Sequence, residues 1–145
     1  MTFLPTTEYD TLGSTDALRD RLVPFIGERA VTLFSYAISD ENDCLVSTAF
    51  FRRILIGSGE DPEQPQVTET EQLLIDWGRL IASTPSSIEP EFYARLERAF
   101  NPQLRVLLVA FAGQVVARNL FTTVGKVPLD EELYEFRKPG DDRTS

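Results

Sequence analysis

The chain of 145 residues contains no histidine and a single cysteine, Cys44. Histidine is the side chain whose charge ordinarily changes between about pH 5 and 8, so its absence excludes histidine-dependent proton relays and histidine-based metal sites. One cysteine cannot form an internal disulfide or an internal dithiol pair, although it permits a disulfide between two subunits. We therefore expect a protein of the reducing cytoplasm, without a metal or another cofactor.

Basic residues are also few, with 14 Lys and Arg against 23 Asp and Glu and a formal net charge of −9. The densest basic groups, Arg52-Arg53 and the pair Arg95 and Arg98, have apolar or acidic neighbours, so phosphate backbones and anionic membrane surfaces would repel the chain. The N-terminus lacks the basic start and apolar core of a signal peptide, and no window approaches the length of a membrane span. We therefore expect neither nucleic acid nor a membrane among its partners.

Alternating strand patterns are short and rare in this sequence, whereas helical spacing of apolar residues recurs nearly everywhere. The length and the 42% hydrophobic content suit one domain with its own core. The pattern predicts an all-α bundle of about six helices over residues 14–137, between an N-terminal tail, 1–13, and a C-terminal tail, 138–145. The helices are expected from near 14–16 to 25 and over 30–38, 43–56, 68–82, 89–100 and 102–123, with a short amphipathic piece over 130–137.

Turn and capping residues set the expected helix boundaries. Pro24 is expected to kink or break the first helix, and the polar segment 39–43 is expected to end the second, because short polar side chains compete for backbone hydrogen bonds. Thr68 and Glu71 have the spacing of a capping box, and Gly125 is expected to end the long apolar helix.

The predicted helix over 102–123 is apolar almost all round, and such a helix belongs at the centre of a bundle or at a subunit interface. We therefore expect a homo-oligomer. Arg118 and Asn119 are polar residues late in this helix, and a buried arginine needs a carboxylate or carbonyl partner. They are expected to close a subunit interface or to face a pocket beside Cys44; a snorkelling arginine at the helix end is the alternative.

Cys44 stands at the start of the predicted helix over 43–56, where Cys44, Ser47 and Phe51 fall at i, i+3 and i+7 on one face. A helix N-terminus favours a thiolate, whereas the nearby acidic residues Asp40 and Glu41 disfavour a further negative charge. Two interpretations stay open for Cys44, a redox-active thiol and a small buried apolar residue. The acidic segment itself has neither the spacing of a calcium loop nor a histidine, which favours a solvated turn over a metal site.

The segment Asn-x-Cys-x-x-Ser-x-x-x-Phe, residues 42–51, resembles the Cys-x-x-Cys-x-x-x-His motif of the alkylhydroperoxidase AhpD-like and carboxymuconolactone decarboxylase family. The downstream order is also similar to the family, with one helix opening at 67–72, the next at 87–91, and an apolar helix ending at 125–130. The resemblance covers residues 15–135 and rests more on this arrangement than on an invariant motif. It implies an AhpD-like helical bundle.

In this family the first cysteine supports or resolves, the second attacks peroxide, and a histidine and an upstream glutamate relay protons. The resemblance retains the first cysteine as Cys44 but places Ser47 at the second cysteine and Phe51 at the histidine, with Glu28 or Glu41 in the place of the glutamate. A serine hydroxyl cannot form a sulfenic acid, and phenylalanine cannot move a proton. The resemblance therefore implies a degenerate site without the standard peroxidase or decarboxylase chemistry.

Three hypotheses follow for the function. The first is an AhpD-like protein whose pocket, lined by Cys44, Ser47 and Phe51, binds a small-molecule ligand, or which acts in assembly. The second is a one-cysteine hydroperoxide reductase, an antioxidant enzyme in which Cys44 is oxidised and then restored by an external thiol. The third is a helical adaptor whose apolar helix forms an obligate interface.

Overall fold

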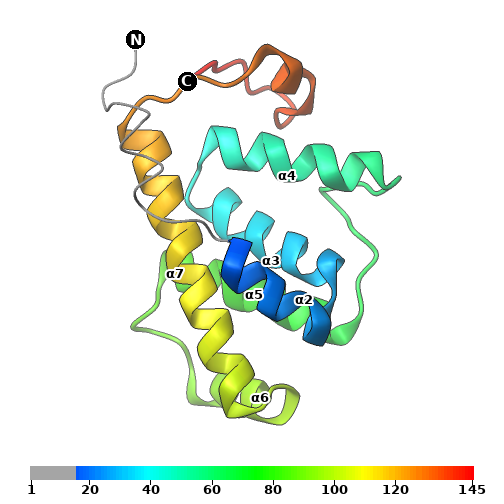
Figure 1. Ribbon diagram of the computed structural model, residues 1–145, viewed down its shortest axis with the longest axis vertical. Coiled ribbons are helices and arrows are strands. Elements are labelled where there is room, and N and C mark those ends of the chain that lie inside the picture. Colours follow the sequence, from blue (N-terminus) through cyan, green and yellow to red (C-terminus); the bar gives the residue numbers. More distant parts are fainter. Residues whose placement is uncertain (1–15) are drawn as a thin grey trace.

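The computed structural model describes residues 16–145 and is all-α in this range (Figure 1). Its elements are six α-helices and one 3-10 helix, with no strand among the described residues. In chain order they are α2 (Asp16–Ile26), α3 (Glu28–Glu41), α4 (Leu45–Gly57), α5 (Glu69–Ser83), α6 (Pro90–Ala99), α7 (Pro102–Val124) and η2 (Glu131–Phe136). The predicted all-α fold of about six helices is confirmed, whereas the expected N-terminal tail, 1–13, lies outside the described residues.

Several helix boundaries follow directly from capping residues. Thr68 accepts a hydrogen bond from the backbone N–H of Glu71, and the Glu71 carboxylate accepts one from the N–H of Thr68, which confirms the capping box of α5. Pro90 and Pro102 occupy the first turns of α6 and α7, where a missing N–H costs nothing. Pro24, expected to kink or break the first helix, lies within α2.

The end of α3 differs from its prediction. The helix continues through Ser39 to Glu41, because Ser39 lies inside the packed part of the helix and is fully buried. It ends in a Schellman motif, in which the N–H of Asp43 donates to Asp40 O and the N–H of Cys44 donates to Ser39 O, both at 3.0 Å. Asp43 takes the left-handed position at φ 54°, which turns the chain sharply into α4.

Helix α3 is the central helix of the described chain. All residues from Ala30 to Ser39 are buried, and α3 contacts α2, α4, α5 and α7. The centre was one of two places expected for the apolar helix α7, and that alternative is wrong. Helix α7 buries one face, including Leu108 and Phe111, while Val106 and Leu120 on the other face are 68% and 64% exposed.

Helix α7 also corrects the expectation that no segment approaches a membrane span. Its 23 residues are long and apolar enough to cross a membrane, judged by length and composition alone. A core helix of a soluble protein meets the same criterion, and α7 is partly buried against the other helices. One such helix is therefore weak support for a membrane location.

Helices α5 and α3 lie close together at Gly78. A Cβ atom on Gly78 would lie 3.2 Å from side-chain atoms of Phe34 and Ile38 and from the Phe34 carbonyl oxygen. Phe34 in turn packs against Trp77 of α5 and Phe111 of α7, with ring centroids 6.1 and 6.4 Å apart. This cluster forms the main core and leaves the opposite side of α3 to α4.

Residues 138–145, expected to be a frayed tail, are bound to the helical domain. Arg143 donates hydrogen bonds to both carboxylate oxygens of Asp43, at 2.9 and 3.2 Å, and Lys138 donates to Asp40 at 2.7 Å. The N–H of Leu129 donates to the carbonyl oxygen of Thr144 at 2.7 Å. These contacts place the C-terminal segment against the α3–α4 turn.

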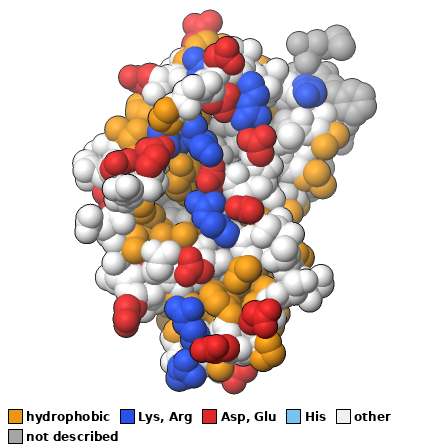
Figure 2. Space-filling view, turned by 180° about the vertical axis from the view of Figure 1, so that it is seen from behind, with side chains coloured by type: hydrophobic (Ala, Val, Ile, Leu, Met, Phe, Trp, Pro, Cys, Tyr) orange, Lys and Arg blue, Asp and Glu red, His pale blue; other side chains and the backbone are white. Residues whose placement is uncertain are grey.

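On the face shown in Figure 2, acidic and basic side chains are interspersed.

Candidate functional site

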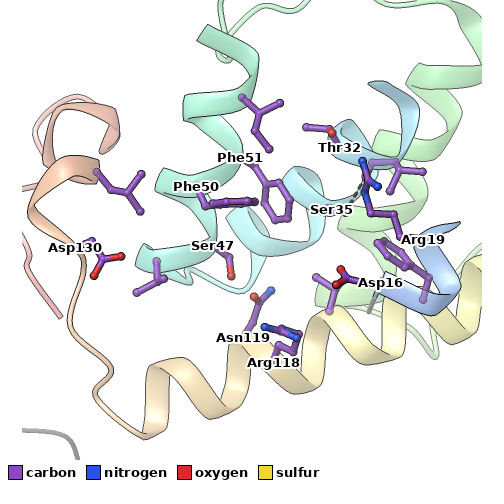
Figure 3. A pocket seen from close by; sticks show the side chains of 16 residues that line it. Asp16, Arg19, Thr32, Ser35, Ser47, Phe50, Phe51, Arg118, Asn119 and Asp130 are labelled. Atoms are coloured by element: carbon purple, nitrogen blue, oxygen red, sulfur yellow. Dashed lines mark hydrogen bonds between the residues drawn. The ribbon is translucent and has the colours of Figure 1, made fainter. Parts of the chain in front are cut away.

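A cavity of about 710 Å³ lies between α2, α3, α4, α7 and η2 (Figure 3). Its volume falls in the range of small-molecule sites, which is about 300–1,000 Å³. Half of the sixteen lining residues are apolar, namely Val31, Val46, Phe50, Phe51, Ile54, Phe111, Val115 and Leu133. The others are the neutral polar residues Thr32, Ser35, Ser47 and Asn119 and the charged residues Asp16, Arg19, Arg118 and Asp130. An apolar wall with a few polar groups is typical of a ligand site.

The structure brings two of the three motif residues to this cavity. Ser47 and Phe51 line it from α4, whereas Cys44 does not line it and is fully buried. Cys44 is the N-cap of α4, with φ −88° and ψ 102°, so its backbone is extended rather than helical. The i, i+3, i+7 rule holds only within a helix, so the expected pocket lined by Cys44, Ser47 and Phe51 is wrong at Cys44.

Asn119 is the polar residue that ties two walls of the cavity together. Its side chain is 2% exposed, and its Nδ2 donates hydrogen bonds to Ser39 Oγ at 3.1 Å and to Asn42 Oδ1 at 3.0 Å. These bonds join α7 to the end of α3. The sequence expectation placed Asn119 at a pocket or an interface, and the structure places it at the pocket.

The charged lining residues balance in sign. Asp16 and Asp130 contribute two carboxylates, and Arg19 and Arg118 contribute two guanidinium groups, so the formal charges cancel. Arg19 also forms an ion pair with Glu28 at 3.1 Å. Arg118 lines the cavity from α7, which agrees with one of its three expected alternatives, a position facing a pocket, although Cys44 does not line this pocket. The electrostatic field of this set favours neither an anion nor a cation strongly.

Glu41 lies outside the cavity and forms an ion pair with Arg79 at 3.4 Å. Its neighbour Asp40 pairs with both Arg79 and Lys138. Burial acts to raise the pKa of Asp40, but the hydrogen bonds from Lys138 and Arg79 outweigh it and hold this pKa below its ordinary value. Among residues 16–145 no group of three or more acidic or cysteine side chains could hold a metal ion. The acidic segment is therefore held by ion pairs.

Arg52 is the buried arginine that the sequence reading missed. It is 4% exposed, and it donates to Phe136 O at 2.9 Å, to Tyr36 Oη at 3.2 Å and to Glu63 Oε1. The hydrogen bonds to Tyr36 and Glu63 hold its pKa above the ordinary value even though burial opposes this. Arg52 thus fixes α4 to α3, to the loop before α5 and to η2. One sequence signal could have indicated its burial: Arg52 is a charged residue with the apolar residues Phe51 and Leu55 close to it in the helix.

Arg29 performs a similar task at the other end of α3. It donates to both carboxylate oxygens of Glu60, at 2.5 and 3.1 Å, to Glu71 at 2.5 Å and to the carbonyl oxygen of Gln66. The proline-containing loop over 60–66 is therefore fastened at Arg29 and at Arg52. These contacts keep the loop away from the cavity, which opens on another side of α3.

Comparisons with protein-family models, with curated proteins and with solved structures found no match to this chain. The site is therefore interpreted from its own geometry and chemistry.

Proposed function

We propose that this chain is an AhpD-like helical protein that binds a small, largely apolar ligand in the cavity and lacks dithiol peroxidase activity. The observation that carries the proposal is the position of Ser47 and Phe51 on the cavity wall. These are the positions that the family resemblance gives to the second cysteine and the histidine. A site with the same location but without redox or proton-transfer groups keeps the capacity to bind and loses the chemistry.

The burial of Cys44 favours ligand binding over the one-cysteine peroxidase alternative. A peroxidatic thiol must meet its peroxide as a thiolate, and reactive cysteines are accordingly at least partly accessible. The Cys44 side chain is fully buried and lies outside the cavity lining. A buried free cysteine ordinarily serves as a small apolar residue.

A binding assay with 1-aminoanthracene, a neutral probe whose fluorescence increases in apolar sites, tests the proposal. The wild-type protein should bind the probe, and Ser47→Phe should weaken binding by at least about tenfold because the new ring occupies the cavity. Ile56→Phe is the matched control, since Ile56 is an exposed residue of α4 that does not line the cavity. An absence of probe binding, or equal affinities in the two variants, contradicts the proposal.

The peroxidase alternative is tested by the rate of cumene hydroperoxide reduction with dithiothreitol. We expect the same rate from the wild type and from Cys44→Ala, at the level of the reaction without protein. A protein-dependent rate that disappears in Cys44→Ala would establish the one-cysteine hydroperoxide reductase instead.

Self-assembly through α7 is a second candidate function, and the exposed apolar face of this helix favours it. Val106, Val109, Leu120 and Val124 are each at least half exposed, and α7 carries no acidic residue. A second copy of this acidic chain would meet least charge repulsion across such a face. Light scattering should report an oligomer that Leu120→Glu dissociates, while Phe25→Glu on α2 should leave it intact. A monomeric wild type contradicts this candidate.

A further inference from the structure

The Asn119 side chain has one hydrogen-bonding atom directed to the cavity. Both protons of its amide nitrogen are donated, one to Ser39 Oγ and one to Asn42 Oδ1, which fixes the orientation of the amide. The acceptor Oδ1 has no partner among residues 16–145. The one fully buried side-chain polar atom without a partner in that range is Gln114 Oε1, so Asn119 Oδ1 is not fully buried, and Asn119 lines the cavity.

Ser47 supplies a second polar group beside Asn119. In Figure 3 the Ser47 side chain from α4 and the Asn119 side chain from α7 point toward one another at the cavity. The Ser47 hydroxyl likewise has no hydrogen-bond partner within the described range. It can donate one hydrogen bond and accept others, whereas Asn119 Oδ1 can only accept.

We infer that the cavity selects a neutral apolar ligand with a hydroxyl group, which donates to Asn119 Oδ1 and accepts from the Ser47 hydroxyl. The inference rests on the proposed ligand-binding function and names the ligand class for that site. A carboxylate cannot donate to Oδ1, and its lone pairs would face the lone pairs of the amide oxygen. An ammonium group would lose its hydration while the charged lining offers no net negative charge. An alcohol or a phenol satisfies both protein groups without a charge.

Ser35 also lines the cavity, but its hydroxyl differs from that of Ser47 in its hydrogen bonding. The Ser35 hydroxyl donates to Val31 O at 2.7 Å and is therefore already satisfied within α3. Removal of either hydroxyl changes the cavity surface by one atom. Only the removal of the Ser47 hydroxyl should alter the recognition of a ligand hydroxyl.

Calorimetric titration with 2-naphthol and with its methyl ether, 2-methoxynaphthalene, tests the inference. The wild type should bind 2-naphthol more tightly by about 3- to 10-fold, the effect of one or two net hydrogen bonds. Ser47→Ala should reduce this preference while retaining the affinity for the ether, and Ser35→Ala should leave the preference unchanged. The Asn119 side-chain amide resonance should shift with 2-naphthol and much less with the ether.

The outcomes separate the inference from the proposed function. Equal binding of the two compounds overturns the hydroxyl preference and leaves the ligand-binding function standing. A preference that survives Ser47→Ala without a shift of the Asn119 resonance overturns the assignment of these two residues. If neither naphthalene compound binds while 1-aminoanthracene does, the hydroxyl inference fails alone; if none of the three binds, the proposed function fails with it.

Discussion

The two sides of α3 differ in packing: one side is closely packed and the other borders a cavity. On the α5 side, Gly78 allows helix backbones to approach until a Cβ would be 3.2 Å from Phe34 and Ile38, and the rings of Phe34 and Trp77 fill the remaining space. On the α4 and α7 side, the same helix presents Thr32 and Ser35 to a cavity of about 710 Å³. The same turns of α3 therefore have one tightly packed face and one face that borders a cavity.

The difference shows that residue size at the point of closest approach decides whether helices meet. Glycine has no side chain to hold the helices apart on the α5 side, whereas the large residues Phe50 and Phe51 of α4 line the cavity on the other side. An open site must then be held by specific polar contacts, because it lacks the dispersion contacts of a filled core. Asn119 and Arg52 provide them, so we expect stability to depend on packing on one side and on hydrogen bonds on the other.

The largest effect is expected from Gly78→Val on the packed side. A branched side chain at Gly78 overpacks the contact with Phe34 and Ile38 and should lower the free energy of unfolding by about 2–3 kcal/mol. Urea denaturation measures the change. Gly113→Ala on α7 is the control, because a Cβ there meets nothing within 4 Å, and it should stabilise by about 0.5–1 kcal/mol. Equal effects of the two substitutions would contradict the tight packing at Gly78.

Asn119→Ala should produce the largest polar effect on the cavity side. It removes the hydrogen bonds to Ser39 and Asn42 and should lower the free energy of unfolding by about 2 kcal/mol, since each net bond contributes about 1 kcal/mol. Urea denaturation again provides the measurement. A change below about 0.5 kcal/mol would mean that packing, not hydrogen bonding, holds α7 to α3 here.

The ion pairs of Asp40 with Arg79 and Lys138 join α3 to α5 and to the C-terminal segment, and we expect them to make a pH-dependent contribution to stability. Because the folded-state pKa of Asp40 lies below its ordinary value, its contribution is complete above about pH 4 and is lost as the pH falls through the folded pKa. Arg79 and Lys138 are partly exposed, so Asp40→Asn should cost less than about 1 kcal/mol at pH 7.

Urea midpoints at pH 7, 5, 4 and 3 check the direction of this prediction. The variant Asp40→Asn should show a smaller loss of stability on acidification than the wild type. Part of the loss should remain, because Glu71 and Asp141 also have folded-state pKa values below their ordinary ones. An identical pH dependence in variant and wild type would show that the Asp40 ion pairs do not form in solution.

The smallest effect is expected from Thr32→Val on the cavity side of α3. The Thr32 hydroxyl has no hydrogen-bond partner among residues 16–145, so its replacement by a methyl group leaves no broken bond. The free energy of unfolding should change by less than about 0.5 kcal/mol. Thermal denaturation is sufficient to detect a larger change. Such a change would indicate that the Thr32 hydroxyl makes a stabilising interaction in solution.

Much of the helical framework was predictable because its signals are local. The capping box at Thr68 and Glu71 and the prolines at the starts of α6 and α7 act through neighbouring backbone groups, and each was located correctly from sequence. The end of α3 was less accurate. Ser39 is a poor interior residue for an isolated helix, but its burial against Asn119 extends α3 to Glu41.

The candidate site was predictable only in part. Ser47 and Phe51 reach the cavity because they share a face of α4, which the helical period fixes. Cys44 does not, because an N-cap residue has extended dihedral angles and leaves that face. Arg52 was overlooked because its partners Glu63 and Phe136 lie 11 and 84 residues away in the sequence. The apolar residues near Arg52 indicate that it is buried, but no local feature of the sequence identifies its partners.

The sequence by itself determined the all-α class, the positions of most helix ends and the absence of histidine and dithiol chemistry, since all three depend on composition or on contacts within a few residues. The tertiary structure decided that α3 rather than α7 is central, that Cys44 is sealed from the cavity, and that Asn119 and Ser47 face one another there. Those outcomes depend on which helix faces meet, and that choice follows from the summed burial and hydrogen bonding of residues far apart in the chain.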